Sequence, residues 1–355
     1  MIPSKRNINS RLFVKTLSFI AVIIAFSCIS ARKSQNPTLL HAETSPSSDK
    51  IIVAYVTSWS DLIPETDHIT HINYAFGHVS ESFDGVIIDN ESRFREIVKL
   101  NEKDKKLKIL LSIGGWGSGR FSEMVADTIL RSGFARDCRR VVDEFDIDGI
   151  DLDWEFPGSS SAGISSSTDD RDNFTKLINE LRNSLGNDKL LTLASSSRRI
   201  YYDFLAIIDK LDFVNIMTYN MGSPPFHHSG LFPSAFTRYY GDNAVKMHLN
   251  TGIPKEKLVL GIPFFGRGKS EPMDFLSYRD VKHQDLTEKW DVLAKVPFLV
   301  NSKREIVLVY ENPLSIAYKC NYILANGLHG AMFWEYAQDD DQGSLRKMIW
   351  RKLRR

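Results

Sequence analysis

Eight short apolar runs recur along the chain from residue 51 onward, each rich in Val, Ile, Leu, Phe and Tyr. They occupy residues 51–56, 69–76, 109–114, 149–155, 190–194, 213–219, 258–264 and 330–334. Stretches with the apolar spacing of a helix separate most of them, at residues 94–103, 121–145, 172–185 and 313–325. Strands that alternate with helices predict parallel strands joined by crossover helices, and eight such units close into a (β/α)8 TIM barrel of the α/β class.

A doubly wound open sheet is the alternative architecture. It requires a glycine-rich phosphate-binding turn after its first strand, and residues 56–59 (Val-Thr-Ser-Trp) contain no glycine. The segment between the seventh and eighth expected strands is long and contains apolar runs at residues 296–299 and 306–310. We therefore predict a small insertion at about residues 268–312, within a barrel that extends from residue 51 to residue 355.

The N-terminal 31 residues have the order of an export signal. Four basic residues and no acidic residue precede an apolar run at residues 17–29, and small residues follow up to Ala31. The run is too short to span a bilayer comfortably, although a retained membrane anchor is the alternative. Cleavage after Ala31 is one prediction. A lipoprotein signal that ends before Cys28 is the other, with a lipidated Cys28 that anchors the protein to a membrane.

The sequence therefore predicts an exported protein that is secreted, periplasmic or lipid-anchored at the cell envelope. Residues 32–50 are polar and contain Ser and Pro, which predicts a flexible tether. The net charge of +1 combines basic ends with an acidic body: residues 346–355 carry six basic groups and residues 1–31 carry four, so that residues 32–345 have a net charge of −9. The overall net charge of +1 argues against a general nucleic-acid-binding surface.

The remaining cysteines, Cys138 and Cys320, lie in stretches with helical spacing. We expect both to be buried apolar side chains rather than a disulfide or a pair of metal ligands. No stretch of the chain has zinc-ligand spacing. We therefore predict neither a metal ion nor a cofactor.

The densest chemical signal is the acidic segment at residues 148–155, Asp-Gly-Ile-Asp-Leu-Asp-Trp-Glu. On a strand, Asp151, Asp153 and Glu155 would face the same side, about 6.6 Å apart along the chain, while Trp154 would face the helices. The carboxyl end of a barrel strand opens into the active-site mouth, which places Glu155 outermost and Asp151 deepest. Burial and like charge should keep one carboxyl group protonated near neutral pH, as a general acid requires.

Three other interpretations of this segment are weaker. A solvated edge fits poorly with the apolar residues that interleave at strand spacing. A calcium-binding loop would contain glycine, asparagine and a turn. A phosphatase-type Asp-x-Asp metal site would need a second cluster of ligands, which the sequence does not show. Catalysis is the interpretation that we retain.

The segment resembles the Asp-x-x-Asp-x-Asp-x-Glu signature of glycoside hydrolase family 18, the chitinases and their relatives. Further matches follow in the order of the family, and together they cover about residues 50–345. They are Ser-Ile-Gly-Gly-Trp at residues 112–116, Met-Thr-Tyr at 217–219, Gly-Ile-Pro-Phe-Phe-Gly-Arg at 261–267 and Gly-Ala-Met-Phe-Trp-Glu-Tyr at 330–336.

The resemblance implies a mechanism in which Glu155 protonates the glycosidic oxygen and later activates water. The substrate's own acetamido oxygen would attack the anomeric carbon, giving an oxazolinium ion and net retention, an exception to the scheme with two enzyme carboxylates. By the same resemblance, Asp153 orients the acetamido group, Asp151 tunes Asp153, and Tyr219 hydrogen-bonds the acetamido carbonyl.

The resemblance also implies a substrate pocket with Trp334 as its floor. The other residues predicted to bind substrate are Tyr55, Phe76, Trp116, Met217, Asn220 and Arg267. Core packing is the alternative for Tyr55, Phe76 and Met217, and a structural ion pair is the alternative for Arg267. Asn220 departs from the family, which usually has Asp after this tyrosine, so we expect an altered pH profile.

The resemblance thus implies an endo-acting hydrolase of β-1,4-linked N-acetylglucosamine, with chitin or chitooligosaccharides as substrate. The short insertion implies an open groove, which favours internal cleavage. One alternative is an endo-β-N-acetylglucosaminidase that acts on the core of N-glycans. Another alternative is a non-catalytic chitin-binding lectin, although such relatives typically lose the acid that Glu155 provides here.

Overall fold

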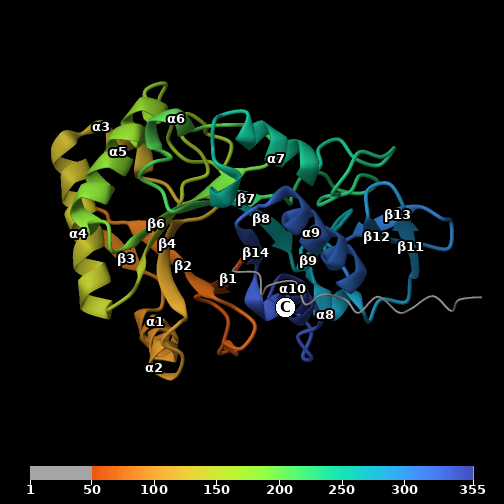
Figure 1. The fold of residues 1–355 in the computed structure, drawn as a ribbon. Coiled ribbons are helices and arrows are strands. Elements are labelled where there is room, and N and C mark those ends of the chain that lie inside the picture. Colours follow the sequence, from red (N-terminus) through yellow and green to blue (C-terminus); the bar gives the residue numbers. More distant parts are fainter. Residues whose placement is uncertain (1–49, 355) are drawn as a thin grey trace, which may run out of the picture. The chain divides into compact units, whose positions relative to one another are not determined.

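Residues 50–354 are described by the computed structural model, and a closed parallel barrel forms their centre (Figure 1). Its strands are β1 (Ile51–Thr57), β2 (His71–Val79), β4 (Lys108–Gly114), β5 (Gly149–Asp153), β6 (Leu190–Ser196), β7 (Phe213–Met217), β8 (Leu258–Pro263) and β14 (Gly330–Trp334). Parallel pairing of β1 with both β2 and β14 closes the barrel, and β3 (Val86–Ile88) adds an antiparallel strand to β2. The predicted (β/α)8 TIM barrel is therefore confirmed.

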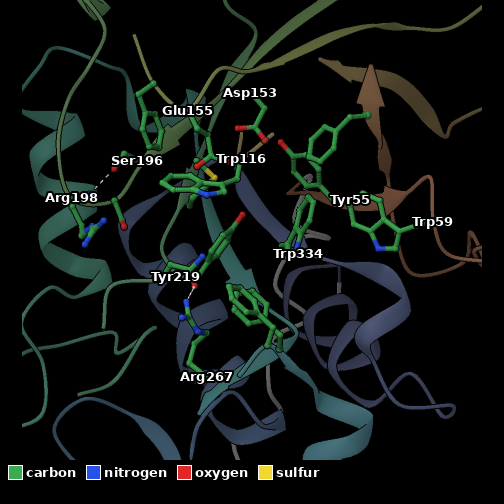
Figure 2. Close-up of a pocket in the computed structure, with 17 residues that line it drawn as sticks. Tyr55, Trp59, Trp116, Asp153, Glu155, Ser196, Arg198, Tyr219, Arg267 and Trp334 are labelled. Carbon is green, nitrogen blue, oxygen red and sulfur yellow. Dashed lines mark hydrogen bonds between the residues drawn. The ribbon is translucent and has the colours of Figure 1, made fainter. Parts of the chain in front are cut away.

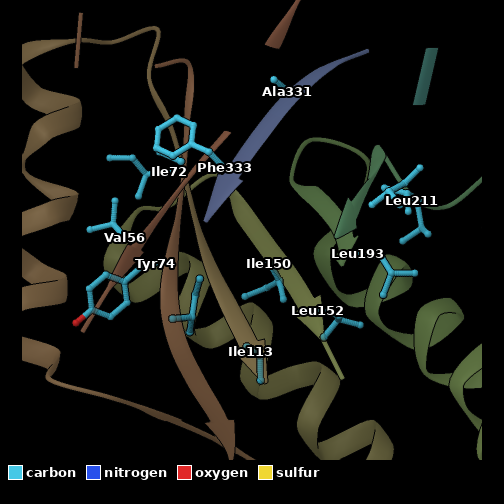
Figure 3. Packing of buried hydrophobic residues seen from close by; sticks show 14 of the residues in the cluster. Val56, Ile72, Tyr74, Ile113, Ile150, Leu152, Leu193, Leu211, Ala331 and Phe333 are labelled. Carbon is cyan, nitrogen blue, oxygen red and sulfur yellow. The ribbon is translucent and has the colours of Figure 1, made fainter. Parts of the chain in front are cut away.

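Helices connect the barrel strands and cover their outer faces. They are α1 (Glu91–Val98), α2 (Leu100–Lys103), α3 (Phe121–Ala126), α4 (Thr128–Phe145), α5 (Asp170–Leu185), α6 (Phe204–Ile207), α7 (Gly241–Leu249), α9 (Pro313–Asn326) and α10 (Ser344–Leu353), with 3₁₀ turns η1 (Lys255–Lys257) and η2 (Tyr336–Gln338). Apolar side chains of the strands fill the layer between barrel and helices, as Ile150 and Leu152 of β5 do in Figure 3.

A second, antiparallel sheet follows β8 and begins at the carboxyl end of that strand. Its strands, in spatial order, are β10 (Leu276–Ser277), β9 (Phe265–Gly268), β13 (Ile306–Val309), β12 (Val296–Val300) and β11 (Thr287–Asp291), with the short helix α8 (Tyr278–Val281) between β10 and β11. Because β9 starts two residues after β8 ends, this sheet is anchored beside the mouth of the barrel.

The side chains expected to face the helices do so. Trp154 is fully buried and stacks on Phe121 of α3, with ring centroids 5.3 Å apart. Cys138 on α4 and Cys320 on α9 are also fully buried and unpaired, as predicted. These side chains contribute apolar packing between the barrel and its helices.

Several expected element boundaries are wrong. The single helix expected over residues 121–145 is divided at Asp127, whose extended backbone lets its carboxylate cap α4. Its Oδ1 accepts from the amides of Ile129 (2.7 Å) and Leu130 (3.1 Å). In addition, β5 ends at Asp153 and β7 at Met217, each two residues earlier than expected.

The predicted signal segment, the lipidated Cys28 and most of the tether fall within residues 1–49, outside the described residues. Between residues 50 and 354, none of the helices has both the length and the apolar character that a membrane crossing requires.

The cap of α4 leads to a stability prediction. Asp127→Ala removes the acceptor for two amides and should lower the free energy of unfolding by about 1 kcal/mol. Asp127→Asn keeps a capping oxygen and should retain most of that stability. Urea unfolding monitored by circular dichroism measures both variants, and equal loss in the two would contradict the capping role.

Candidate active site

Asp151 lies at the centre of the barrel and is completely buried. Side chains from other barrel strands donate hydrogen bonds to its carboxylate: Tyr55 (2.7 Å), Ser112 (2.8 Å), Thr192 (2.5 Å) and Asn215 (3.4 Å). Burial raises the pKa of Asp151, and these hydrogen bonds, that from Thr192 first, oppose the rise. Asp151 is therefore held below the cavity described next and does not line it.

Asp153 and Glu155 lie together at the carboxyl end of β5. Burial raises the pKa of Glu155 from an ordinary 4.5 to about 7. Burial, followed by the negative charges of Glu155 and Asp151, raises the pKa of Asp153 well above its usual range. Crowded carboxyl groups of this kind hold a proton near neutral pH, as the sequence predicted, although Glu155 lies beyond the end of the strand.

One oxygen of this pair is available to a ligand. Asp153 is 4% exposed, and its Oδ1 has no hydrogen-bond partner among residues 50–354. Buried polar atoms in folded proteins are nearly always paired. An unpaired oxygen beside a cavity can therefore accept a hydrogen bond from a molecule that enters it.

Two glycines allow the neighbouring strand to approach the carboxyl groups. Gly114, at the end of β4, has φ of 132°, and a Cβ there would lie 2.2 Å from the carbonyl oxygen of Asp153. A Cβ on Gly115 would lie 2.7 Å from the ring of Phe76. Glycine is therefore required at both positions for the strand to pass this close.

A cavity of about 560 Å³ opens at this end of the barrel (Figure 2). Its lining contains every residue that the sequence assigned to catalysis or substrate binding except Asp151: Glu155, Asp153, Tyr219, Trp334, Tyr55, Phe76, Trp116, Met217, Asn220 and Arg267. The side chains come from five barrel strands (β1, β2, β5, β7 and β14), from the loops that follow barrel strands and from β9. Among residues 50–354, no group of three or more His, Cys, Asp or Glu side chains is placed to hold a metal ion.

Trp334 lies in the middle of an aromatic wall of this cavity. Its ring stacks on Phe76 with centroids 5.7 Å apart and an interplanar angle of 22°. It also lies 5.4 Å from the ring of Tyr55 and 6.4 Å from that of Trp59. Aromatic faces of this kind pack well against the apolar faces of sugar rings, and the acid of Glu155 lies in the same cavity.

Arg267 also lines the cavity and has a protein partner. Its Nη2 lies 3.0 Å from Asp274 Oδ2, and its Nη1 donates to Asn220 Oδ1 at 2.8 Å. The guanidinium also lies 4.1 Å above the ring of Phe275. Arg267 therefore forms the structural ion pair given as its alternative, and because it also lines the cavity its role in substrate binding stays a prediction.

Several lining residues were not anticipated. They are Trp59, Phe156, Ser196, Ser197, Arg198, Phe265 and Phe275. Most of them lie in loops just after a barrel strand or in the inserted sheet, where hydrophobic periodicity is uninformative. Position immediately after a barrel strand is the signal that would have identified Trp59 and Arg198.

The comparison with known proteins agrees with this geometry. The family model for glycosyl hydrolases family 18 matches residues 51–339. The chain belongs to glycosyl hydrolase family 18. It is 30% identical over 305 residues to Chitinase A1 of Niallia circulans, covering 71% of this chain and 44% of that protein. It is 29% identical over 359 residues to the Endochitinase of Manduca sexta, covering 82% of this chain and 64% of that protein.

The family also contains a solved structure with a similar fold. A family 18 N-acetylglucosaminidase from Paenibacillus barengoltzii matches with a TM-score of 0.78 and 31% identity, covering 86% of this chain and all of that chain. The present chain spans less than two thirds of the length of each of the two curated relatives. The shared region is the barrel domain that holds the cavity.

The departure of Asn220 from the family leads to a prediction about proton binding. Asn220→Asp adds a carboxylate to the cavity that holds Asp153 and Glu155. Its negative charge disfavours ionisation of Glu155, so the pKa of Glu155 should rise above about 7. Carbon-13 NMR titration of the side-chain carboxyl groups measures this shift. Asn183→Asp, on the exposed face of α5, is the matched control, and an equal titration in both variants would contradict the prediction.

Proposed function

We propose that this protein hydrolyses β-1,4 linkages between N-acetylglucosamine units, with chitin or chitooligosaccharides as substrates. The observation that carries the proposal is the pairing of Glu155, whose pKa is about 7, with Asp153, whose Oδ1 is unpaired among the described residues, in one cavity beside Trp334. The family membership and the chitinases among its relatives support the same substrate class.

In the proposed reaction, the sugar at the cleavage point stacks on Trp334. Its acetamido N–H donates to Asp153 Oδ1, and the hydroxyl of Tyr219 donates to the acetamido carbonyl oxygen. Tyr219 lines the cavity, and its hydroxyl is 4.0 Å from the weak acceptor Met332 Sδ, so it can turn to a better partner. These contacts hold the acetamido oxygen below the anomeric carbon.

Cleavage then proceeds with the proton supplied by Glu155. Glu155 donates its proton to the glycosidic oxygen while the acetamido oxygen attacks the anomeric carbon, and the bond to the leaving sugar breaks. The resulting oxazolinium ion carries positive charge. The carboxyl group of Asp153 offsets this charge as the acetamido N–H proton of the substrate shifts toward Asp153 Oδ1. The Glu155 carboxylate next removes a proton from water, which attacks the anomeric carbon. The bond from that carbon to the acetamido oxygen then breaks, which restores the acetamido group and gives retained configuration.

The role of Glu155 is tested by substitution. Glu155→Gln keeps the shape of the side chain but has no acidic proton, so kcat should fall by roughly 10²- to 10⁴-fold. Release of reducing ends from chitooligosaccharides measures this loss. Glu102→Gln on α2, an exposed position, is the matched control and should retain full activity.

The same assay separates the alternatives. A wild-type protein that binds the oligosaccharides but releases no reducing ends is a lectin, and the proposal is then wrong. Faster cleavage of a high-mannose glycoprotein than of chitooligosaccharides would assign the enzyme to N-glycans instead.

The pKa of Glu155 also predicts the pH dependence. The acid is active in its protonated form, so kcat/KM should decrease as pH rises through about 7, by tenfold per pH unit well above that value. Initial rates with an uncharged chitooligosaccharide between pH 4 and 9 give this limb directly. A limb centred near 4.5, the ordinary pKa of glutamic acid, would show that burial does not govern the proton of Glu155.

A further inference from the structure

One edge of the cavity carries a group of arginines that pack on aromatic rings. We call this group the basic–aromatic rim, and it consists of Arg198, Arg199 and Arg238 with Tyr201, Phe226 and Tyr239. The guanidinium carbons lie over ring centroids in three pairs: Arg198 over Tyr239 (5.7 Å), Arg199 over Tyr201 (5.1 Å) and Arg238 over Phe226 (4.0 Å). The rings orient the arginines without neutralising them.

The rim is continuous with the cavity. Arg198 is itself part of the cavity lining. Tyr201 stacks on Phe156, another lining residue, with centroids 4.5 Å apart and an interplanar angle of 8°. Tyr239 follows Arg238 directly in sequence and lies beneath Arg198. A ligand that extends out of the cavity on this side therefore meets the rim.

The three guanidinium groups are exposed and lack acidic partners. Within residues 50–354, no carboxylate oxygen lies within 4.0 Å of Arg198, Arg199 or Arg238. Arg267, the other arginine that lines the cavity, differs because Asp274 neutralises it. The rim thus offers unused N–H donors in the fork geometry that matches carboxylates and other oxyanions.

The rim lies at a definite place relative to the reaction. In Figure 2, Arg198 and Trp59 are on opposite sides of Glu155 and Trp334. A polysaccharide that places one sugar on Trp334 and its scissile oxygen at Glu155 would extend past Glu155 toward Arg198. Its neighbouring sugar would therefore present its substituents to the basic–aromatic rim.

We propose that the basic–aromatic rim binds a carboxylate substituent on the sugar that follows the cleavage point, so that the protein prefers acidic derivatives of N-acetylglucosamine polymers to neutral ones. This inference rests on the proposed function, whose substrate class it narrows. The net charge of −3 over residues 32–355 would by itself weakly repel an anionic polymer. The exposed arginines of the rim would attract the carboxylate locally, although the net negative charge of the protein opposes binding.

Two soluble polymers with the same backbone test the proposal. Carboxymethyl chitin and glycol chitin carry substituents of similar size at the same hydroxyl group, and only the first is charged. Their dissociation constants are measured with the Glu155→Gln protein, so that the polymers are not cleaved during the binding measurement. Carboxymethyl chitin should bind more tightly at low ionic strength. Arg198→Gln combined with Arg199→Gln should reduce that advantage by about two- to five-fold, and 0.5 M salt should reduce it similarly.

Controls separate this inference from general electrostatics. Arg136→Gln removes an exposed positive charge from α4 and should leave the advantage unchanged. An equal loss with Arg136→Gln, or equal affinities for the two polymers at low salt, would overturn the inference. Failure of the wild-type protein to cleave either polymer would overturn the proposed function instead, because the binding comparison does not require cleavage.

Discussion

The buried carboxylate of Asp151 is the interaction on which the rest of the site depends. Burying a charged group costs several kcal/mol unless hydrogen bonds compensate, and a hydrogen bond to a charged group contributes about 1.5–3 kcal/mol. Four donors from β1, β4, β6 and β7 converge on this carboxylate, which itself belongs to β5. These contacts fix the relative register of five strands at the level directly below the cavity. The ends of those strands are thereby positioned to carry the groups that line the cavity.

The same buried charge sets the chemistry above it. The negative charge of Asp151 contributes to the raised pKa values of Asp153 and of Tyr55. Burial and the negative charge of Glu155 also raise the pKa of Asp153, so that protons are held in the cavity at a pH where isolated carboxyl groups would have lost them. Packing and acid–base behaviour therefore have one cause, namely acidic side chains stacked along β5 into a low-dielectric interior.

The sequence predicted most of this arrangement because strand spacing and the acidic segment report directly on the barrel interior. Alternation along residues 149–153 correctly separated Asp151 and Asp153 from the outward Leu152. It did not predict where β5 ends, because hydrophobic spacing continues through Trp154 although the strand pairing stops. It also missed Arg198, whose position depends on a loop of the tertiary structure rather than on a local pattern. It did not predict the division of the helix at Asp127 either, because the apolar spacing of a helix continues across that residue although its carboxylate caps α4.

These successes and failures reflect two different kinds of constraint. Asp151, Gly114 and Gly115 are restricted by close contacts in the barrel. A Cβ at Gly114 would meet backbone, a Cβ at Gly115 would meet the ring of Phe76, and replacing Asp151 would leave its buried hydrogen-bond donors without a partner. The arginines of the basic–aromatic rim lie on loops beyond the strands, over ring faces, and none of them donates to Asp151, so their replacement leaves the hydrogen bonds to Asp151 intact. If the proposed roles are correct, this arrangement would let the rim discriminate the substituents of a substrate while the proton chemistry at Glu155 stays the same. Specificity and catalysis would then be separable, because different contacts hold their residues in place.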